Sequence, residues 1–158
     1  MKAAEEEFRV LRLGSGDVQL MQKLVQLFHI VFETGNANVA GTSHLEKLLS
    51  NPVFIALALV RGNEIAGGLT AYELPAYYSA SPEIYIYDIA VHPQFQRKGL
   101  GEKLLSALED HCRRNGIATM FVEAHEEDAH AIDFYRATGG KAEKVVHFNY
   151  FLADAEEK

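Results

Sequence analysis

Residues 88–101 read DIAVHPQFQRKGLG, and in this stretch an apolar strand runs into a glycine-rich turn that opens an amphipathic helix. The first backbone N–H groups of a helix have no partner within the helix, and the helix dipole adds partial positive charge there. Gly99 and Gly101 remove side chains from this junction, and Arg97 and Lys98 add positive charge beside it. We therefore predict a phosphate-binding turn that is formed largely by the main chain.

The order of residues in this turn disfavours two common nucleotide motifs. Lys98 precedes Gly99, whereas a P-loop needs a lysine after its glycine and then a serine or threonine. Leu104 stands where a dinucleotide-binding fingerprint would have its third glycine. Neither ATP nor NAD is favoured as the ligand.

Alternating and helical patterns continue on both sides of the turn. Strands are expected at 8–13, 53–61, 64–74, 83–91, 117–124 and 141–151, and helices after residue 17 and at 44–50, 99–115 and 129–138. Helix starts are expected from Asp17, from a capping box of Ser43 and Glu46, and from Asp128. Because no repeat or linker interrupts the chain, we predict one α/β (α+β) domain over residues 8–151, with acidic tails at 1–7 and 152–158. Its central sheet is mixed, mostly antiparallel and flanked by helices.

Two short motifs carry a resemblance to a known family. Residues 96–101 resemble the Gln/Arg-x-x-Gly-x-Gly/Ala signature of GNAT acetyltransferases, and residues 134–139 resemble that family's Phe-Tyr-x-x-x-Gly block. More narrowly, residues 54–58, 83–91 and 146–148 are similar to the type I aminoglycoside 3-N-acetyltransferases. The resemblance covers about residues 8–151 and implies a single GNAT domain.

The resemblance also implies a reaction and a set of residues. Acetyl-CoA would be the co-substrate, and the acceptor would be the 3-amino group of the 2-deoxystreptamine ring of an aminoglycoside, giving antibiotic resistance. Tyr135 would donate a proton to the departing thiolate, whereas an isolated helical tyrosine is more often a core residue. The residues expected to hold the co-substrate are Ile89, Ala90, Val91, Gln96, Arg97, Lys98, Gly99, Leu100, Gly101 and Tyr135.

Asp88 interrupts an apolar strand, where a carboxylate without a partner would be costly. It is the first candidate to accept the proton of the acceptor amine, and a hydrogen-bonded structural role is the equal alternative. Strand alternation places Asp88 with Ile86 and Ala90, on the face opposite Glu83, unless a bulge intervenes. The two carboxylates are therefore not expected to act as a pair.

Acidic residues are also expected around the acceptor. The full set is Glu83, Asp88, Glu126, Glu127 and Asp128. The resemblance implies that the loop at 126–128 borders the acceptor cleft, although capping and solvation explain at least one of its acids. Glu123, His125 and His130 depart from the Gln, Asp and Pro of the family pattern, which leaves the acceptor open.

Other chemistry has weaker support. His125, Asp128 and His130 match no known zinc spacing, so no metal is expected. Cys112 falls on the apolar stripe of its helix and is a poor nucleophile, and His147 fits a packed strand histidine better than a catalytic one.

The composition of the chain limits which partners and which cellular compartment are expected. The net charge of −7 disfavours nucleic acid, and a single cysteine without an N-terminal apolar run predicts a cytoplasmic protein with no membrane partner. The acceptor alternatives are a polyamine, another small amine or a protein amino group, and a non-catalytic acyl-CoA-binding module is the third hypothesis. The oligomeric state, with a homodimer as one option, is left open.

Overall fold

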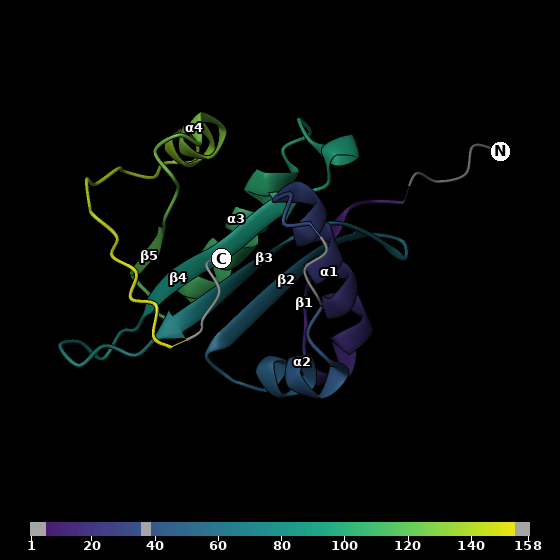
Figure 1. Cartoon of the computed structure of the whole chain (residues 1–158), viewed down its shortest axis with the longest axis horizontal. Helices are drawn as coiled ribbons and strands as arrows, with labels where there is room; N and C mark the ends of the chain where they lie inside the picture. The colour runs from purple at the N-terminus through teal and green to yellow at the C-terminus, as the bar shows by residue number, and fades with distance from the viewer. Residues whose placement is uncertain (1–5, 36–38, 154–158) are drawn as a thin grey trace. The chain divides into compact units, whose positions relative to one another are not determined.

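The computed structural model describes residues 6–35 and 39–153, and its chain divides into two compact units, Met1–Glu123 and Ala124–Lys158. The first unit contains a five-stranded sheet in the order β1-β2-β3-β4-β5 (Figure 1). Its strands are β1 (Arg9–Arg12), β2 (Phe54–Arg61), β3 (Glu64–Leu74), β4 (Glu83–Val91) and β5 (Thr119–Val122). All neighbours are antiparallel except β4 and β5, which confirms the expected mixed sheet.

Helices flank this sheet, as the α/β prediction requires. The first unit contains η1 (Ser15–Asp17), α1 (Val18–Val31), α2 (Thr42–Leu49), η2 (Pro93–Phe95) and α3 (Leu100–Arg114), and the second contains α4 (Ala129–Ala137). No helix in the described ranges is long and apolar enough to cross a membrane.

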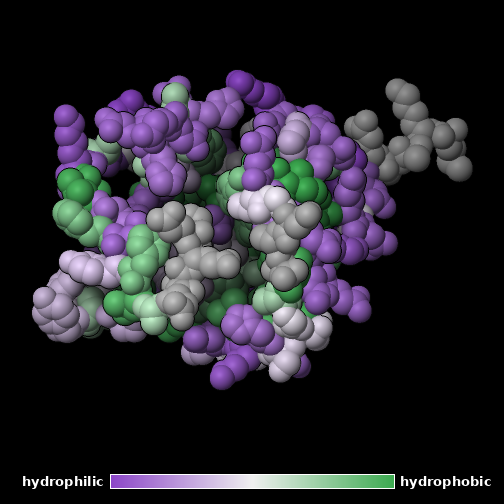
Figure 2. Space-filling view, in the orientation of Figure 1, coloured by the Kyte–Doolittle hydropathy of each residue, from purple (hydrophilic) through white to green (hydrophobic). Residues whose placement is uncertain are grey.

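The two faces of the sheet are covered by different helices (Figure 1). On one face α1 and α2 pack over β2 and its neighbours, where an added Cβ at Gly68 would collide with the Leu24 side chain. Glycine at this position lets α1 approach the sheet closely. The outward side of α1 is mostly hydrophilic (Figure 2). On the other face, α3 supplies a buried stripe that includes Leu104, Leu108 and Cys112.

Helix capping follows the sequence only in part. The Asp128 carboxylate accepts the Ala131 N–H at 3.0 Å, so the predicted cap of α4 is confirmed. Asp17 occupies the cap position of α1, but its carboxylate accepts the Gly14 N–H instead. The predicted capping box of Ser43 and Glu46 is wrong, because α2 begins two residues earlier than expected, at Thr42, and its N-cap is Gly41.

The predicted last strand at 141–151 is also wrong for this chain. Residues 141–152 belong to no helix or strand, and all of them are exposed. Apolar alternation gives a segment strand propensity, but a strand exists only where another edge pairs with its backbone.

Candidate functional site

A β-bulge in β4 determines which residues of this strand share a face. Thr70 of β3 pairs with Asp88, but the next residue, Ala71, pairs with Ile86, so Tyr87 is an extra residue on β4. An extra residue reverses the alternation of faces on one side of the bulge. The predicted arrangement of carboxylates on opposite faces is therefore corrected, because Asp88 lies on the same face as Glu83 and Tyr85.

Aromatic rings form a continuous row on this face. Tyr72 lies 5.9 Å from Tyr87, Tyr87 lies 5.9 Å from Tyr85, and Tyr85 stacks on Phe121 with 4.9 Å between ring centroids. Tyr87 is 51% exposed and Phe121 38% exposed, so the row presents ring surface to solvent. Phe54 joins the other end of the row to the core, 5.2 Å from Tyr72. Sequence reasoning missed this row, although the spacing of Tyr85 and Tyr87 places both rings on one side of an ideal strand.

Carboxylates accompany the aromatic row. The Tyr85 hydroxyl donates a hydrogen bond to Glu123, and burial followed by the charge of Glu123 raises the pKa of Tyr85. Burial raises the pKa of Tyr72 as well, and electrostatic interactions with Tyr87 and Asp88 add to this effect. Glu123, which was not among the predicted site residues, thus joins Asp88 in making this face electrostatically negative.

The expected site residue Glu83 lies at the start of β4. Its carboxylate accepts a hydrogen bond from the Tyr78 hydroxyl, and this bond is the main cause that raises the pKa of Tyr78. Glu83 pairs with Thr119, the first residue of β5. It therefore lies next to β5, on the same face as Tyr85 and Asp88. The first unit thus gathers Glu83, Asp88 and Glu123 on one side of the sheet.

The turn that the sequence predicts to bind phosphate has the backbone conformation expected from its glycine. Gly99 caps α3 with φ +73°, and α3 begins at Leu100. Arg97 also adopts a left-handed conformation, with φ +66°, and its side chain is exposed. Gly101 lies in the first turn of α3, where backbone N–H groups have no earlier carbonyl to bind. These features provide main-chain donors beside a positive side chain.

The end of β4 has one edge outside the β5 ladder. Pairing between β4 and β5 covers residues 83–86 only, so the predicted residues Ile89, Ala90 and Val91 lie beyond it. The Gln96 side chain donates a hydrogen bond to the Val91 carbonyl at 2.9 Å, which ties the turn to the strand. An extended ligand could pair with main-chain groups at such an edge.

Phe95 anchors this turn in the first unit. Its ring is buried, lies 5.4 Å from the Phe8 ring and has the Arg61 guanidinium 4.7 Å from its centroid. The Lys98 ammonium lies 5.7 Å from the same centroid. Of the two predicted cations, Lys98 thus contacts the turn itself, and this contact helps to fix the turn in place.

The predicted residues of the second unit lie in and before α4. Glu126 and Glu127 are exposed, whereas Asp128 caps the helix. Tyr135 is half-buried, and its carbonyl accepts the Gly140 N–H at 2.8 Å. An added Cβ at Gly140 would lie 2.9 Å from that carbonyl, so this glycine allows the chain to close over the end of α4.

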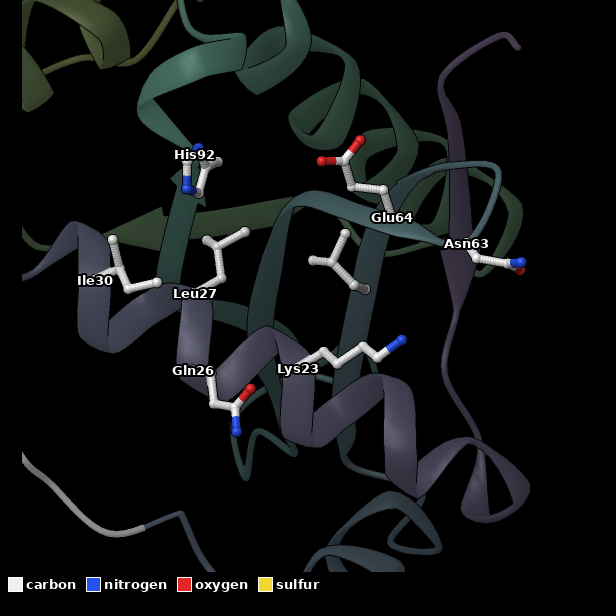
Figure 3. A pocket seen from close by; sticks show the side chains of 8 residues that line it. Lys23, Gln26, Leu27, Ile30, Asn63, Glu64 and His92 are labelled. Carbon is white, nitrogen blue, oxygen red and sulfur yellow. The ribbon is translucent and has the colours of Figure 1, made fainter.

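A separate open hollow of about 320 Å³ lies between α1 and the β2–β3 turn (Figure 3). Its lining includes Lys23, Ile30, Glu64 and His92, and it contains none of the predicted site residues. Glu64 accepts a hydrogen bond from the Gln94 amide at 3.2 Å. This hollow is therefore next to the segment that leads from β4 into the turn.

Cys112, His147 and the possible metal ligands are the remaining candidates. Cys112 is buried, and burial raises the pKa of its thiol, as expected for a poor nucleophile. His147 contacts the Asn149 side chain at 3.1 Å. Across the described residues, no three His, Cys, Asp or Glu side chains are grouped to hold a metal ion.

Comparison with known proteins finds a matching family and similar solved structures. Residues 19–139 match the model of the Acetyltransferase (GNAT) family. An aminoglycoside acetyltransferase from an uncultured soil metagenomic sample, solved in complex with sisomicin, is 40% identical with a TM-score of 0.89, over 92% of this chain and 96% of that one. A second soil metagenomic aminoglycoside acetyltransferase is 35% identical with a TM-score of 0.87, over 93% and 99% of the two chains.

A curated relative matches a shorter region. The [Ribosomal protein bS18]-alanine N-acetyltransferase of Escherichia coli K12 is 38% identical over 69 residues, which are 44% of this chain. The match spans 46% of that relative, less than half of its length.

The contact between Tyr85 and Glu123 predicts that the pKa of Tyr85 depends on the charge of Glu123. Replacing Glu123 by glutamine should lower the pKa of Tyr85, because the amide no longer repels the phenolate. The pKa should stay above its ordinary value, because burial is the larger cause. Carbon-13 NMR of tyrosine labelled at Cζ measures it, with the resonance assigned through Tyr85→Phe.

Glu102→Gln, in the exposed first turn of α3, is the matched control and should leave Tyr85 unchanged. An identical Tyr85 titration in wild type and Glu123→Gln would contradict this contact.

Proposed function

Because the chain belongs to the GNAT acetyltransferase family and is thus an N-acetyltransferase, we propose that it transfers an acetyl group from acetyl-CoA to an aminoglycoside. The observation that carries the choice of acceptor is the face of β3, β4 and β5, where aromatic rings lie beside Glu83, Asp88 and Glu123. The two soil relatives, similar over nearly the whole chain, support the same acceptor class.

This face has the chemistry that an aminoglycoside requires. Its several ammonium groups can pair with separated carboxylates, and an ammonium over a tyrosine ring gains a further attraction. The sugar rings can pack against Tyr85, Tyr87 and Phe121, whose ring faces are partly exposed. Glu126 and Glu127 are proposed to add charge from the second unit. The proposed position of modification is the 3-amino group of the 2-deoxystreptamine ring, in line with the resemblance to type I enzymes.

The co-substrate is proposed to bind through main chain. The pyrophosphate of acetyl-CoA would accept hydrogen bonds from N–H groups of residues 97–101 and pair with Arg97. The extended part of the molecule would lie along the edge at residues 89–91. Gln96 holds these two parts together through its bond to Val91.

The reaction then needs two proton transfers. The neutral amine attacks the thioester carbonyl carbon, forming a C–N bond, and the C–S bond breaks to release the thiolate. Asp88 is proposed to accept the amine proton, directly or through water, and Tyr135 to protonate the thiolate. The bulge supports the first role, because it leaves Asp88 on the same face as Tyr85, where the acceptor is proposed to bind. The second is supported by the position of Tyr135 in the Phe-Tyr-x-x-x-Gly block.

A protein amino group is the second candidate acceptor. The curated alanine N-acetyltransferases, similar over 69 residues, favour it. An N-terminal α-amino group next to basic residues would also suit an acidic face. Polyamines remain the third acceptor, and the family match argues against a module without catalysis. The single buried cysteine supports a cytoplasmic site of action, and a homodimer is its proposed assembly.

The acceptor is tested by coenzyme A release over a panel of aminoglycosides, spermidine and a peptide that begins with alanine. Gentamicin should react and gain one acetyl group, and two-dimensional NMR should place it on the 3-amino nitrogen. Its affinity should weaken as salt rises, because partly exposed ion pairs are screened beyond about 8–10 Å near physiological ionic strength.

Acetylation of another aminoglycoside amine would reject the 3-position but retain the acceptor class. Release with the peptide or spermidine alone would reject aminoglycosides.

The phosphate turn is tested by Gly101→Val. The branched side chain in the first turn of α3 should obstruct the phosphates and lower the affinity for acetyl-CoA, measured by calorimetric titration. Ser106→Val, on the exposed side of the same helix, controls for a β-branched residue in α3 and should bind normally. Unchanged affinity in a folded Gly101→Val protein would remove the turn from the co-substrate site.

The two proton-transfer roles are separated by Tyr135→Phe and Asp88→Asn. Tyr135→Phe should bind acetyl-CoA normally but lower kcat by about 10²–10⁴-fold, the usual loss for a general acid. Asp88→Asn should slow transfer most at low pH, where more of the amine is protonated. Steady-state kinetics across pH measures both.

Tyr77→Phe, at a fully exposed tyrosine, and Asp110→Asn, on the exposed side of α3, are the matched controls. Wild-type kcat in Tyr135→Phe, with chemistry rate-limiting, would reject the acid, and an unaltered pH profile in Asp88→Asn would return Asp88 to a structural role.

A further inference from the structure

The segment between β4 and α3 is fastened to the start of β3. The His92 N–H donates to the Ala66 carbonyl at 2.8 Å, and the Gln94 side-chain amide donates to the Glu64 carboxylate at 3.2 Å. The His92 ring adds a local contact, because its Nδ1 accepts the Gln94 N–H at 3.3 Å. β3 therefore holds η2 through main chain and through a side chain, shortly before the turn at residues 97–101.

The same carboxylate also binds the last residue of β2. Arg61 and Glu64 are the final cross-strand pair before the hairpin turn, and the Arg61 guanidinium lies 3.1 Å from Glu64 Oε2. Gln94 uses the other oxygen, Oε1. In Figure 3 the Glu64 and Asn63 side chains point apart, and Glu64 lies on the side of His92. The Glu64 carboxylate thus connects the end of the β2–β3 hairpin with η2.

Arg61 extends this connection to the ring that anchors the turn. Its guanidinium lies 4.7 Å from the centroid of the buried Phe95 ring and 5.2 Å from the centroid of the Phe8 ring. An isolated exposed ion pair contributes little, whereas a pair that belongs to a network contributes more. Arg61 and Glu64 form such a network, which reaches η2 both through Gln94 and through Phe95.

The turn that follows η2 needs support of this kind. Arg97 and Gly99 adopt left-handed backbone conformations, with φ +66° and +73°. For arginine this conformation is costly, and it persists only where the surrounding structure holds the chain in place. Several N–H groups must also point at one place to bind a phosphate. A turn that is already ordered binds it with a smaller loss of conformational entropy.

We propose that Glu64 is a positioning residue for the co-substrate, because its contacts with Gln94 and Arg61 order the turn at residues 97–101 before acetyl-CoA binds. The inference rests on the proposed function, in which this turn binds the pyrophosphate. Glu64 acts through the turn and not on the reacting atoms.

The charge of Glu64 makes this role testable by the sign of the effect. Coenzyme A is a polyanion, and a carboxylate near its phosphates repels it. Electrostatics alone would therefore give Glu64→Met a higher affinity for coenzyme A. Loss of the positioning contacts should lower the affinity instead. Gln94→Met removes the contact with η2 without a change of charge.

The first experiment is calorimetric titration with coenzyme A. Gln94→Met and Glu64→Met should each weaken binding by about two- to tenfold, the range expected when hydrogen bonds that order a site are lost. Unchanged or tighter binding in either folded variant would overturn the proposal.

Two variants elsewhere in the first unit are the matched controls. Glu109→Met removes a comparable ion pair on α3, in which Glu109 lies 3.0 Å from Arg113. Gln22→Met removes the contact of a glutamine amide with Thr42. Both control proteins should bind coenzyme A as wild type does.

The second experiment compares two acetyl donors in steady-state kinetics with the same acceptor. S-Acetylpantetheine has the thioester but lacks the pyrophosphate and the nucleotide. Gln94→Met should lower kcat/KM for acetyl-CoA, mainly through KM, and leave kcat/KM for S-acetylpantetheine unchanged. An equal loss with both donors would overturn the proposal, because it would reveal a general structural effect.

The wild-type protein separates this inference from the proposed function. If wild type has the same kcat/KM with both donors, the turn does not bind pyrophosphate, and the proposed co-substrate site fails together with the positioning role. If wild type prefers acetyl-CoA and Gln94→Met retains the full preference, only the positioning role fails.

Discussion

One extra residue in β4 sets the geometry on which the rest of the site depends. Without the bulge at Tyr87, Asp88 would follow Ile86 onto the α3 side of the sheet, where the carboxylate would meet the apolar core. The bulge reverses the alternation once, so that Ile84 and Ile86 face α3 while Asp88 and Ala90 face α1. The strand thereby keeps both faces properly packed and still presents a carboxylate beside the tyrosines.

The same strand separates two kinds of recognition along its length. Residues 83–86 pair with β5 and support the row of rings, whereas residues 89–91 lie beyond that ladder. The cofactor-binding proposal relies on backbone groups at the open edge and at the start of α3. The acceptor proposal relies on side chains from three strands. The bulge lies between these two regions of β4. An acceptor amine bound to the first region and a thioester bound to the second would therefore meet beside the bulge.

The sequence predicts those features that depend on local patterns. Gly62 and Asn63 define the turn between β2 and β3, and the apolar run of residues 83–91 gives β4 its observed bounds. The bulge could not be predicted, because period-two alternation contains no signal for an extra residue, and with it the shared face of Glu83 and Asp88 was missed. Glu123 was missed because its role depends on β5 lying next to Tyr85. The strand expected at 141–151 has the correct pattern but needs an edge that the pattern cannot supply.

Main-chain recognition of one substrate and side-chain recognition of the other have different consequences for specificity. A turn built from backbone N–H groups and one left-handed glycine tolerates change in most neighbouring side chains, so one fold can retain its co-substrate while the acceptor changes. This accounts for family members whose names give acceptors as different as a ribosomal protein and an aminoglycoside. In this chain the acceptor choice would reside in few side chains, chiefly Tyr85, Tyr87, Asp88 and Glu123. The Tyr85 hydroxyl, whose pKa burial raises, donates to Glu123, and this hydrogen bond holds that carboxylate at the edge of the aromatic row. A cationic acceptor would then find its ring contacts and its charge partners already in place, and less ordering would be required on binding.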